Sequence, residues 1–482
     1  MIIALIGNDG SGKTTISKEL ARLFSDIGFE VHYKHEYDYA ILKFLFRAGG
    51  KQRIEKARQE MLVDKKKSKK FRIWPFLVWF DTFLQHVYYS LFKRNSIIIL
   101  DRYPYDHYIS FGYLDALTKF SEWLYLHFPK PDLVLLLWVE PEIAYERKKA
   151  THTYQVSFYE MQTGKYLELA KILGINAINT NCTLNSTIGK ILDLTVTSDS
   201  QLGKEISRRA LQNKMYFEVL AKRPTDYFSR TVNSFEERKR KFAQTISFLK
   251  ELFNNAGIRE FVIFKDYDEY SWIGNDVDVL IDKNDIVKVI RALEQMKNDA
   301  ATQSKIRWKI SKSHSQAVDV LHDDLLGIDL HTAIGWRGID LLTLDEIIDE
   351  KVTKTKFGVE YPSVKPALDA LIYAFSHVFE KGFVTRLEYH MIEKHLEEFD
   401  RFQISSSIKP YIELFKMKPA RDYPYFLPFS VRLESFSRIA EERKMGRVAG
   451  LTFRIVAMQL FWKVRFQAKK VLPFEIRQYE SQ

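Results

Sequence analysis

The chain has 482 residues, of which 46% are hydrophobic and 28% charged, enough for two to four domains of an ordinary globular protein. Its single cysteine, Cys182, excludes an intramolecular disulfide and a cysteine-rich metal site, which favours a reducing cytoplasm. The net charge of +11 is concentrated in residues 51–72, with ten basic and three acidic residues, and residues 430–482, with eleven basic and five acidic residues.

An apolar run, residues 2–6, opens the chain without a basic leader or cleavage site, so no signal peptide is expected. A turn of pattern G-x-x-x-x-G-K-[ST] follows, and a helical pattern of apolar residues continues to residue 27. Backbone N–H groups on such a strand-turn-helix bind phosphate. Lys13 would reach the β- and γ-phosphates and Thr14 would hold Mg²⁺, the alternative being an ordinary glycine-rich turn. The predicted phosphate-binding residues are Gly7, Asn8, Asp9, Gly10, Ser11, Gly12, Lys13, Thr14 and Thr15.

Helical stretches separate further apolar strand candidates, which predicts a parallel, doubly wound α/β sheet in a first domain of residues 1–197. The third strand ends in Asp101 and Arg102, where an acid would point into the ligand crevice. Asp101 would hold Mg²⁺ through water and Arg102 would grip the acceptor phosphate, unless the two form only a strand-end salt bridge. Arg147, beside two lysines after the fourth strand, predicts either a lid over phosphates or a solvated helix end.

These residues together resemble the thymidylate kinase family. The likeness rests on residues 7–15, on Asp101-Arg102-Tyr103 and on Pro131-Asp132-Leu133, and it covers about the first 197 residues. It implies Mg²⁺ and ATP as cofactors, transfer of the γ-phosphoryl group, a role for Asp9 at the acceptor, and charge neutralisation by Arg102 and Arg147.

Two departures from that family concern the acceptor. Lys34-His35-Glu36-Tyr37 stands where the family has Arg-Glu-Pro, and residues 80–86 contain no arginine where the family places one against the base. We therefore expect a small-molecule acceptor other than thymidylate. A basic insertion at residues 40–74 predicts either a solvated loop or contact with an anionic surface. Trp74, Phe76, Trp79 and Phe80 after it are expected in the core of a helix packed on the sheet.

Polar residues 195–201 predict a linker, and a second domain is expected at residues 205–425. Asp276 and Asp278 lie two residues apart on a predicted strand, so their carboxylates share one face. Asp329 supplies a third acid within another apolar strand pattern. Three converging carboxylates would hold two metal ions, one activating the attacking oxygen and one the leaving pyrophosphate.

This second region resembles nucleotidyltransferases of the DNA polymerase β-like superfamily. The likeness rests on Phe264-Lys265-Asp266, on Asp276-Val277-Asp278 after Gly274, and on Asp329-Leu330-His331. It implies an α+β fold, an NTP substrate attacked at its α-phosphate, and Lys265 near the triphosphate. Asp266 stands where that branch has glycine, and the superfamily's Gly-Ser pair is missing. His331 and His377 are expected to be core histidines, and residues 368–379 to begin a helical accessory bundle.

The last segment, residues 426–482, forms a basic amphipathic tail if residues 452–471 are helical. Its charges are too frequent for it to cross a bilayer. It would either lie on a membrane surface, making the protein peripherally membrane-associated, or pack on the second domain or on another subunit in a homodimer.

The sequence thus favours a bifunctional enzyme: a Mg-ATP-dependent kinase of a small metabolite joined to a nucleotidyltransferase, serving envelope glycan or lipid precursors. The alternative is a thymidylate-type nucleotide kinase with a catalytically silent second domain used for binding. A nucleic-acid-binding regulator is disfavoured because the sequence has no recognisable reading module.

Overall fold

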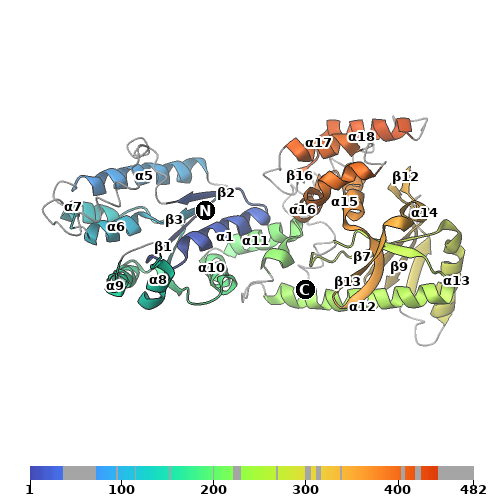
Figure 1. The fold of residues 1–482 in the computed structure, drawn as a ribbon, viewed down its shortest axis with the longest axis horizontal. Helices are drawn as coiled ribbons and strands as arrows, with labels where there is room; N and C mark the ends of the chain where they lie inside the picture. Colours follow the sequence, from blue (N-terminus) through green and yellow to red (C-terminus); the bar gives the residue numbers. More distant parts are fainter. Residues whose placement is uncertain are drawn as a thin grey trace. The chain divides into compact units, whose positions relative to one another are not determined.

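The computed structural model describes residues 1–35, 72–93, 96–113, 115–150, 154–198, 200–220, 229–267, 270–298, 306–310, 316–336, 339–402, 408–417 and 425–442. These residues divide into two compact units, one ending at Ser207 and one beginning at Arg208 (Figure 1). Most of the basic insertion and residues 443–482 of the basic tail lie outside the described residues, so the expectations about them stay predictions.

A five-stranded parallel sheet forms the centre of the first unit, in the order β2-β3-β1-β4-β5. All six residues of β1 are buried because strands flank it on both sides and helices cover both faces. This confirms the parallel α/β fold predicted for residues 1–197. The strands are β1 (Ile2–Gly7), β2 (Val31–His35), β3 (Ile97–Asp101), β4 (Leu133–Trp138) and β5 (Asn176–Asn179).

The helices of this unit form two groups. The helices α1 and α10 contact each other, whereas α5, α6, α7 and α9 form a separate group of contacts (Figure 1). Because β1 pairs in parallel with both β3 and β4, the carboxyl ends of these strands meet at one edge of the sheet, where the phosphate loop lies. The bounds are α1 (Lys13–Asp26), α5 (Trp74–Phe92), α6 (Pro104–Tyr113), α7 (Lys119–Leu126), α8 (Pro141–Lys148), α9 (Val156–Leu173) and α10 (Leu184–Ser198). The next helix, α11 (Ser200–Gln212), contains the division between the two units.

Two expectations for this region were wrong. The predicted linker at residues 195–201 is almost entirely helical, because Val196 is buried and the Thr195 hydroxyl donates to the Ile191 carbonyl within α10. In α5, Trp79 stacks on Phe83 as expected of a core residue, but Phe76 and Phe80 are each 43% exposed. Helix α5 therefore carries large apolar side chains outside its buried face as well as on it.

A seven-stranded mixed sheet, in the order β13-β14-β6-β7-β10-β9-β8, forms the second unit. Its strands are β6 (Phe261–Phe264), β7 (Asp276–Ile281), β8 (Ile306–Ile310), β9 (Gln316–His322), β10 (Gly327–His331), β13 (Lys351–Lys356) and β14 (Val359–Val364). Two small antiparallel pairs accompany it, β11 (Ile334–Trp336) with β12 (Ile339–Leu342) and β15 (Phe383–Val384) with β16 (Tyr425–Phe426).

Helices pack around this sheet in two sets: α12 contacts α13, and the later helices contact one another. The helices are α12 (Ser229–Ala256), α13 (Ile286–Asn298), α14 (Leu344–Ile347), α15 (Pro366–Phe375), α16 (Arg386–His395), α17 (Lys409–Met417) and α18 (Phe429–Glu442). Short π and 3₁₀ turns are η2 (Tyr216–Leu220), η3 (Lys283–Asp285), η4 (Ile348–Glu350), η5 (Ser376–Lys381) and η6 (Leu396–Arg401). The unit mixes sheet and helices, while its nucleotidyltransferase-like fold stays a prediction.

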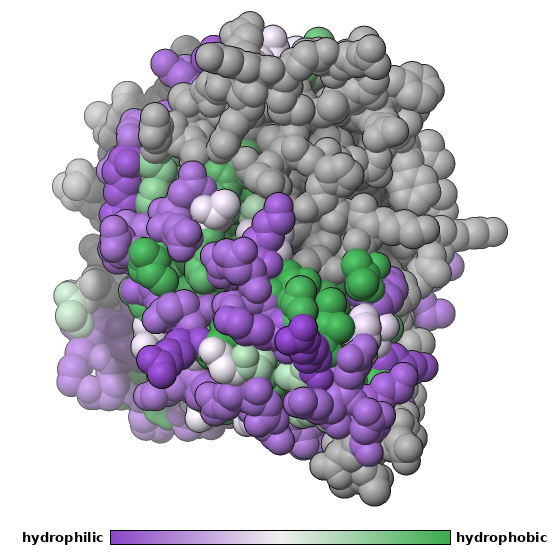
Figure 2. All heavy atoms as spheres, turned by 90° about the vertical axis from the view of Figure 1, so that its right-hand side faces the viewer, coloured by the Kyte–Doolittle hydropathy of each residue, from purple (hydrophilic) through white to green (hydrophobic). Residues whose placement is uncertain are grey.

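Among the coloured residues on the face drawn in Figure 2, most are hydrophilic, and hydrophobic residues form small patches between them. Among the helices in the described part of the chain, none is long and apolar enough to span a membrane.

Candidate functional site

Two glycines let the phosphate loop pack tightly on its neighbours. A Cβ on Gly7, whose φ is +147°, would lie 1.8 Å from the Leu137 carbonyl oxygen on β4. A Cβ on Gly10, at φ +86°, would lie 2.9 Å from the backbone of Ala144 on α8. Neither position tolerates a side chain, so the loop is held directly against β4 and α8.

Lys13 is turned back onto the loop. Its Nζ donates to the carbonyl oxygens of Gly7 at 2.6 Å and Asn8 at 2.8 Å, and the side chain is buried. Burial, and then Arg102, lower the pKa of Lys13 to about 8 against the opposing effects of Asp9, Asp106 and Asp101. The predicted catalytic charges thus act on one another within one site, with Thr14 and Thr15 exposed at the start of α1.

Asp101 and Arg102 follow β3 on the same edge. The Nη2 of Arg102 lies 2.8 Å from Asp9 Oδ1, and the backbone of Arg102 takes the left-handed conformation at φ 90°. Asp101 is buried; its Oδ2 accepts from the Tyr33 hydroxyl at 3.1 Å, and His35 Nε2 lies 3.5 Å away. Its Oδ1 has no hydrogen-bond partner among the described residues, which suits an oxygen that would hold a hydrated Mg²⁺.

The predicted lid arginine lies on the phosphate loop. Arg147 Nη1, on α8, donates to the Gly10 carbonyl at 3.0 Å while the side chain stays exposed. Lys149 instead pairs with Glu146 on its own helix.

Sequence reasoning missed the residues that form hydrogen bonds to the loop from α6 and α9. Asp106 is fully buried on α6 and accepts from the Gly7 N–H at 3.4 Å, the Tyr103 N–H at 2.9 Å and the Tyr166 hydroxyl at 2.7 Å. Burial raises the pKa of Asp106, while Arg102 and Lys13 oppose the rise. An aspartate in the first turn of α6, two residues after Asp101-Arg102-Tyr103-Pro104, was the available signal.

Helix α9 supplies two more of these supports. Gln162 Oε1 accepts from the Asp9 N–H at 2.9 Å, and Asn8 Nδ2 donates to Thr163 Oγ1 at 3.0 Å. Gln162 and Thr163 are buried polar residues on a helix whose other buried side chains are apolar or aromatic. Their burial is seen in the structure, and the sequence pattern alone did not mark them.

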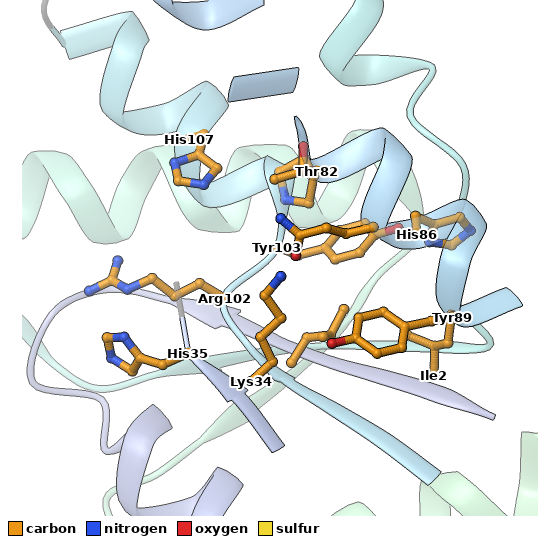
Figure 3. A pocket seen from close by; sticks show the side chains of 12 residues that line it. Ile2, Lys34, His35, Thr82, His86, Tyr89, Arg102, Tyr103 and His107 are labelled. Atoms are coloured by element: carbon orange, nitrogen blue, oxygen red, sulfur yellow. Dashed lines mark hydrogen bonds between the residues drawn. The ribbon is translucent and has the colours of Figure 1, made fainter. Parts of the chain in front are cut away.

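A pocket beside the loop opens between β2, α5 and the start of α6 (Figure 3). None of its twelve described lining residues is acidic. Lys34 extends into it, and Arg102 lies at its side (Figure 3). The lining residues are Ile2, Lys34, His35, Thr82, Gln85, His86, Tyr89, Leu100, Arg102, Tyr103, Pro104 and His107.

In the second unit, strand register brings two of the predicted acids together. β7 and β10 are parallel, and Asp278 lies directly opposite Asp329, while Asp276 lies opposite Gly327. Burial, and then the carboxylates of Asp276, Asp278 and Asp319, raise the pKa of Asp329 to about 8. Burial would also raise the pKa of Asp278, but Lys265 and His331 hold it well below its ordinary value.

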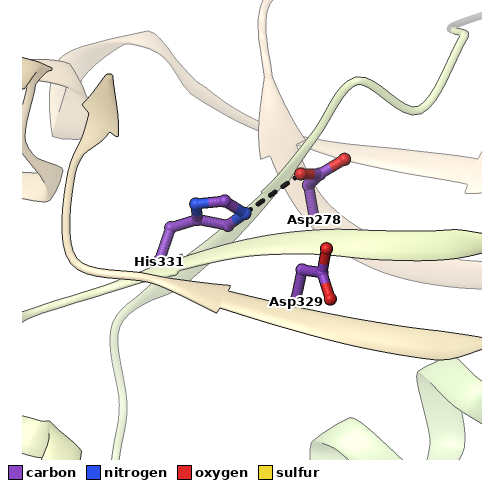
Figure 4. A group of neighbouring side chains, drawn as sticks. All are labelled: Asp278, Asp329 and His331. Carbon is purple, nitrogen blue, oxygen red and sulfur yellow. Dashed lines mark hydrogen bonds and ion pairs between the residues drawn. The ribbon is translucent and has the colours of Figure 1, made fainter. Parts of the chain in front are cut away.

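The second unit's histidines differ in their surroundings. His331 Nε2 lies 3.1 Å from Asp278 Oδ1 (Figure 4), so His331 has the hydrogen-bond partner expected of it, but its side chain is only partly buried. It lies two residues beyond Asp329 on the same face of β10, beside the acids. His377 is fully buried, with Nδ1 3.0 Å from the Tyr411 hydroxyl and Nε2 3.1 Å from Glu388, as expected of a hydrogen-bonded core histidine.

Lys265 reaches the acids from a constrained backbone. Its φ is 55°, its N–H donates to Asp369 Oδ1 at 2.6 Å, and its carbonyl accepts from the Tyr373 hydroxyl at 2.6 Å. Its Nζ lies 3.5 Å from Asp278 Oδ1. Helix α15 therefore fixes the left-handed turn that aims Lys265 at Asp278.

Gly274 and Asp266 line a pocket together with Lys265, Asp276 and Asp278. Arg238 on α12 donates to the Gly274 carbonyl and, at 2.8 Å, to Asn275 Oδ1, which fixes the loop entering β7. Asp266 is buried and accepts from Ser363 Oγ at 2.8 Å and the Tyr361 hydroxyl at 3.2 Å. The nucleotidyltransferase branch that this region resembles has a glycine at this position. Here the aspartate follows β6 and is hydrogen-bonded to β14.

Comparison with known proteins identifies relatives of the first unit. A model of the thymidylate kinase family matches residues 7–188. A protein described as a probable thymidylate kinase from Sulfolobus acidocaldarius is 32% identical over 183 residues, covering 35% of this chain and 82% of the relative. Similar proteins from Saccharolobus solfataricus, 30% identical over 178 residues, and Archaeoglobus fulgidus, 31% over 152 residues, cover 35% and 30% of this chain and 83% and 68% of themselves.

A solved structure of a deoxyadenosine kinase from M. mycoides also matches, at 19% identity. It covers 41% of this chain and all of its own, with a TM-score of 0.26.

Proposed function

The chain belongs to the thymidylate kinase family, and on that premise we propose that its first unit transfers the γ-phosphoryl group of ATP to a small anionic metabolite other than thymidylate. The family uses ATP and Mg²⁺. The single observation that carries the proposal is the phosphate loop with Lys13, the Asp9–Arg102 pair and Arg147 gathered around it.

Each charged residue has a role in this reaction. Lys13 would leave the Gly7 and Asn8 carbonyls for the β- and γ-phosphates, and Arg147 would leave Gly10 for the transferring group. Arg102 would hold the acceptor beside Asp9. Thr14 and the Asp101 Oδ1 oxygen would hold Mg²⁺, which supplies neutralisation of phosphate charge.

The pocket of Figure 3 supports an anionic acceptor. Lys34 and Arg102 bring two cationic side chains to this pocket, and Arg102 is held there by its ion pair with Asp9. On the α5 side the pocket presents Thr82, Gln85 and His86, none of which replaces the base-contacting arginine. These side chains suit a phosphorylated, hydroxyl-rich metabolite better than thymine.

A labelling screen tests this proposal. The purified chain, γ-labelled ATP and a cellular metabolite pool are incubated with Mg²⁺, and the labelled product is identified. We expect a phosphorylated metabolite to gain label, Lys13→Ala to abolish transfer, and Lys18→Ala, on the exposed face of α1, to retain it. Labelling of thymidylate in preference to every other compound would contradict the acceptor assignment, and transfer by Lys13→Ala would contradict the kinase site.

For the second unit we propose transfer of a nucleoside monophosphate from an NTP. The adjacent Asp278 and Asp329, with Lys265 beside them, support it. The rival proposal is a silent binding domain. Asp276→Asn should abolish pyrophosphate release in the presence of NTP and the metabolite pool, whereas Asp323→Asn, at an exposed site on the β9–β10 turn, should not. Absence of pyrophosphate release from the parent chain with every NTP would favour the silent domain.

We also propose a division into three domains, at residues 1–197, 205–425 and 426–482. The pairing of the first two regions supports a role in making envelope glycan or lipid precursors. The charge of the basic tail supports membrane contact or dimerisation through it. Co-sedimentation with anionic vesicles, compared with neutral ones and weakened by salt, would support membrane contact.

A further inference from the structure

We propose that Asp278, Asp329 and His331 form one binding site for a first-row transition-metal dication, which the site takes in preference to Mg²⁺. The proposal deepens the nucleotidyl transfer proposed above, and it rests on that function only for the role of the bound ion. What distinguishes it is the imidazole, because three carboxylates alone would make an ordinary Mg²⁺ site.

Backbone register builds the donor set. Asp278 and Asp329 are direct partners on the parallel strands β7 and β10, so both carboxylates leave the same face of the sheet. His331 lies two residues further along β10 and therefore on that face as well. Three ligand atoms, one from each side chain, lie within 4.8 Å of one another, and the imidazole points at the carboxylates (Figure 4).

Repulsion between Asp329 and the neighbouring carboxylates also favours binding of a cation. Asp319 on β9 lies on its other side, opposite Asp329 in the register, and is paired with Lys309. Lys265 pairs with Asp278. In the described ranges no hydrogen bond or ion pair reaches the Asp329 carboxylate, although like charges stand on both neighbouring strands. A dication between Asp278 and Asp329 would relieve this repulsion.

The nitrogen donor decides which ion fits. Mg²⁺ prefers oxygen ligands and retains its water, whereas imidazole suits transition-metal dications such as Mn²⁺ and Zn²⁺. The His331 ring is also oriented: it packs edge-to-face against Phe264, with ring centres 5.3 Å apart. A ring held in this way offers its Nε2 to the site without further ordering.

The alternative is that His331 only donates a hydrogen bond to Asp278. The variants His331→Gln and His331→Ala separate the two roles. Gln retains an N–H donor near the position of Nε2 but is a poor ligand for a transition metal, so a hydrogen-bonding role survives in Gln, whereas a ligand role is lost in both variants.

Metal binding is measured on the full chain without nucleotide, by titrating Mn²⁺ and following the electron paramagnetic resonance signal of the free ion, with Mg²⁺ as competitor. We expect Mn²⁺ to bind at least about tenfold more tightly than Mg²⁺, and both His331 variants to lose about tenfold or more in Mn²⁺ affinity while Mg²⁺ affinity changes by less than about twofold. His322→Ala, on β9 of the same sheet, is the matched control and should behave as the parent. Asp329→Asn should weaken both ions.

A variant could also lose metal affinity because it misfolds. A spectroscopic measurement on the bound ion separates that effect from the loss of a ligand. Pulsed electron paramagnetic resonance of bound Mn²⁺ should show a ¹⁴N coupling that disappears in His331→Gln and persists in His322→Ala. Absence of that coupling from the parent, its persistence in His331→Gln, or a parallel loss of Mn²⁺ and Mg²⁺ affinity would overturn the proposal. If Mn²⁺ binds through His331 but no NTP releases pyrophosphate, nucleotidyl transfer fails while the metal site stands.

Discussion

At the scale of single residues, the side chains that support the phosphate loop matter as much as those that contact phosphate. Asp106 makes no expected contact with nucleotide, yet it accepts from the backbone of Gly7 and from Tyr103 and Tyr166. It is a positioning residue, because its bonds fix the end of β1 from which the loop departs.

Asp106→Asn should therefore weaken catalysis rather than folding alone. An amide cannot accept from all three donors, and an unsatisfied buried N–H costs about 1–3 kcal/mol, so kcat/KM should fall about fivefold to 150-fold, mainly in kcat. Steady-state kinetics with the identified acceptor, alongside Glu160→Gln on the exposed side of α9, measure this. An unchanged kcat with a raised KM for ATP would point to a role in binding alone.

A second residue-scale prediction concerns a buried cluster of ionisable side chains, Glu388, Lys214, Lys381 and His377. Burial would raise the pKa of Glu388, but Lys214 and Lys381 hold it well below its ordinary value, and burial lowers the pKa of His377. Both groups bind protons more readily when the chain is unfolded, so stability is present at neutral pH and lost as pH falls. We expect the unfolding temperature of the second unit to drop between about pH 7 and pH 4.

Calorimetry across that pH range checks the sign. Glu388→Gln should flatten the lower part of the dependence, and Glu397→Gln, on the exposed surface, should leave it unchanged. A second unit that becomes more stable on acidification would show that other carboxylates outweigh this cluster.

At the scale of elements, sequence patterns located strands well and their partners poorly. The apolar run of β1 and the alternation with helices were sufficient to predict a parallel sheet, because burial on both faces requires such runs. The local sequence does not determine which strands pair or in which register. Segments remote in sequence bring Asp278 opposite Asp329, and they bring Gln162 to the backbone of Asp9. Polar residues 195–201 suggested a linker because their composition conceals the buried side of α10.

The turn after β6 gives a prediction at this scale. Asp266 ties β6 to β14 through Ser363 and Tyr361, and it pairs with Lys354 on β13 at 3.2 Å. Asp266→Ala should lower the free energy of unfolding by about 3–5 kcal/mol, because it removes a buried carboxylate that pairs with a partly buried ammonium and accepts from two hydroxyls. Urea denaturation, with Asp323→Ala as the exposed control, measures the difference. A loss below about 1 kcal/mol would show that water replaces the carboxylate.

At the scale of the whole molecule, the two compact units carry separate candidate sites. A ligand stabilises the unit that binds it, by about 2.7 kcal/mol at a hundredfold excess over Kd. In scanning calorimetry, Mg-ATP should raise the transition of the first unit and Mn²⁺ that of the second. Lys13→Ala should remove the first effect and Asp278→Asn the second. A single transition raised equally by both ligands would show that the units unfold as one.

The bonds from Lys13 to the Gly7 and Asn8 carbonyls mean that the curved backbone of the loop is already organised before nucleotide arrives. An entering triphosphate therefore exchanges one set of partners for another and orders little new chain, so its association carries a small conformational entropy cost. Removing the lysine therefore does more than delete a charge. It also allows the loop backbone to adopt conformations that cannot bind phosphate.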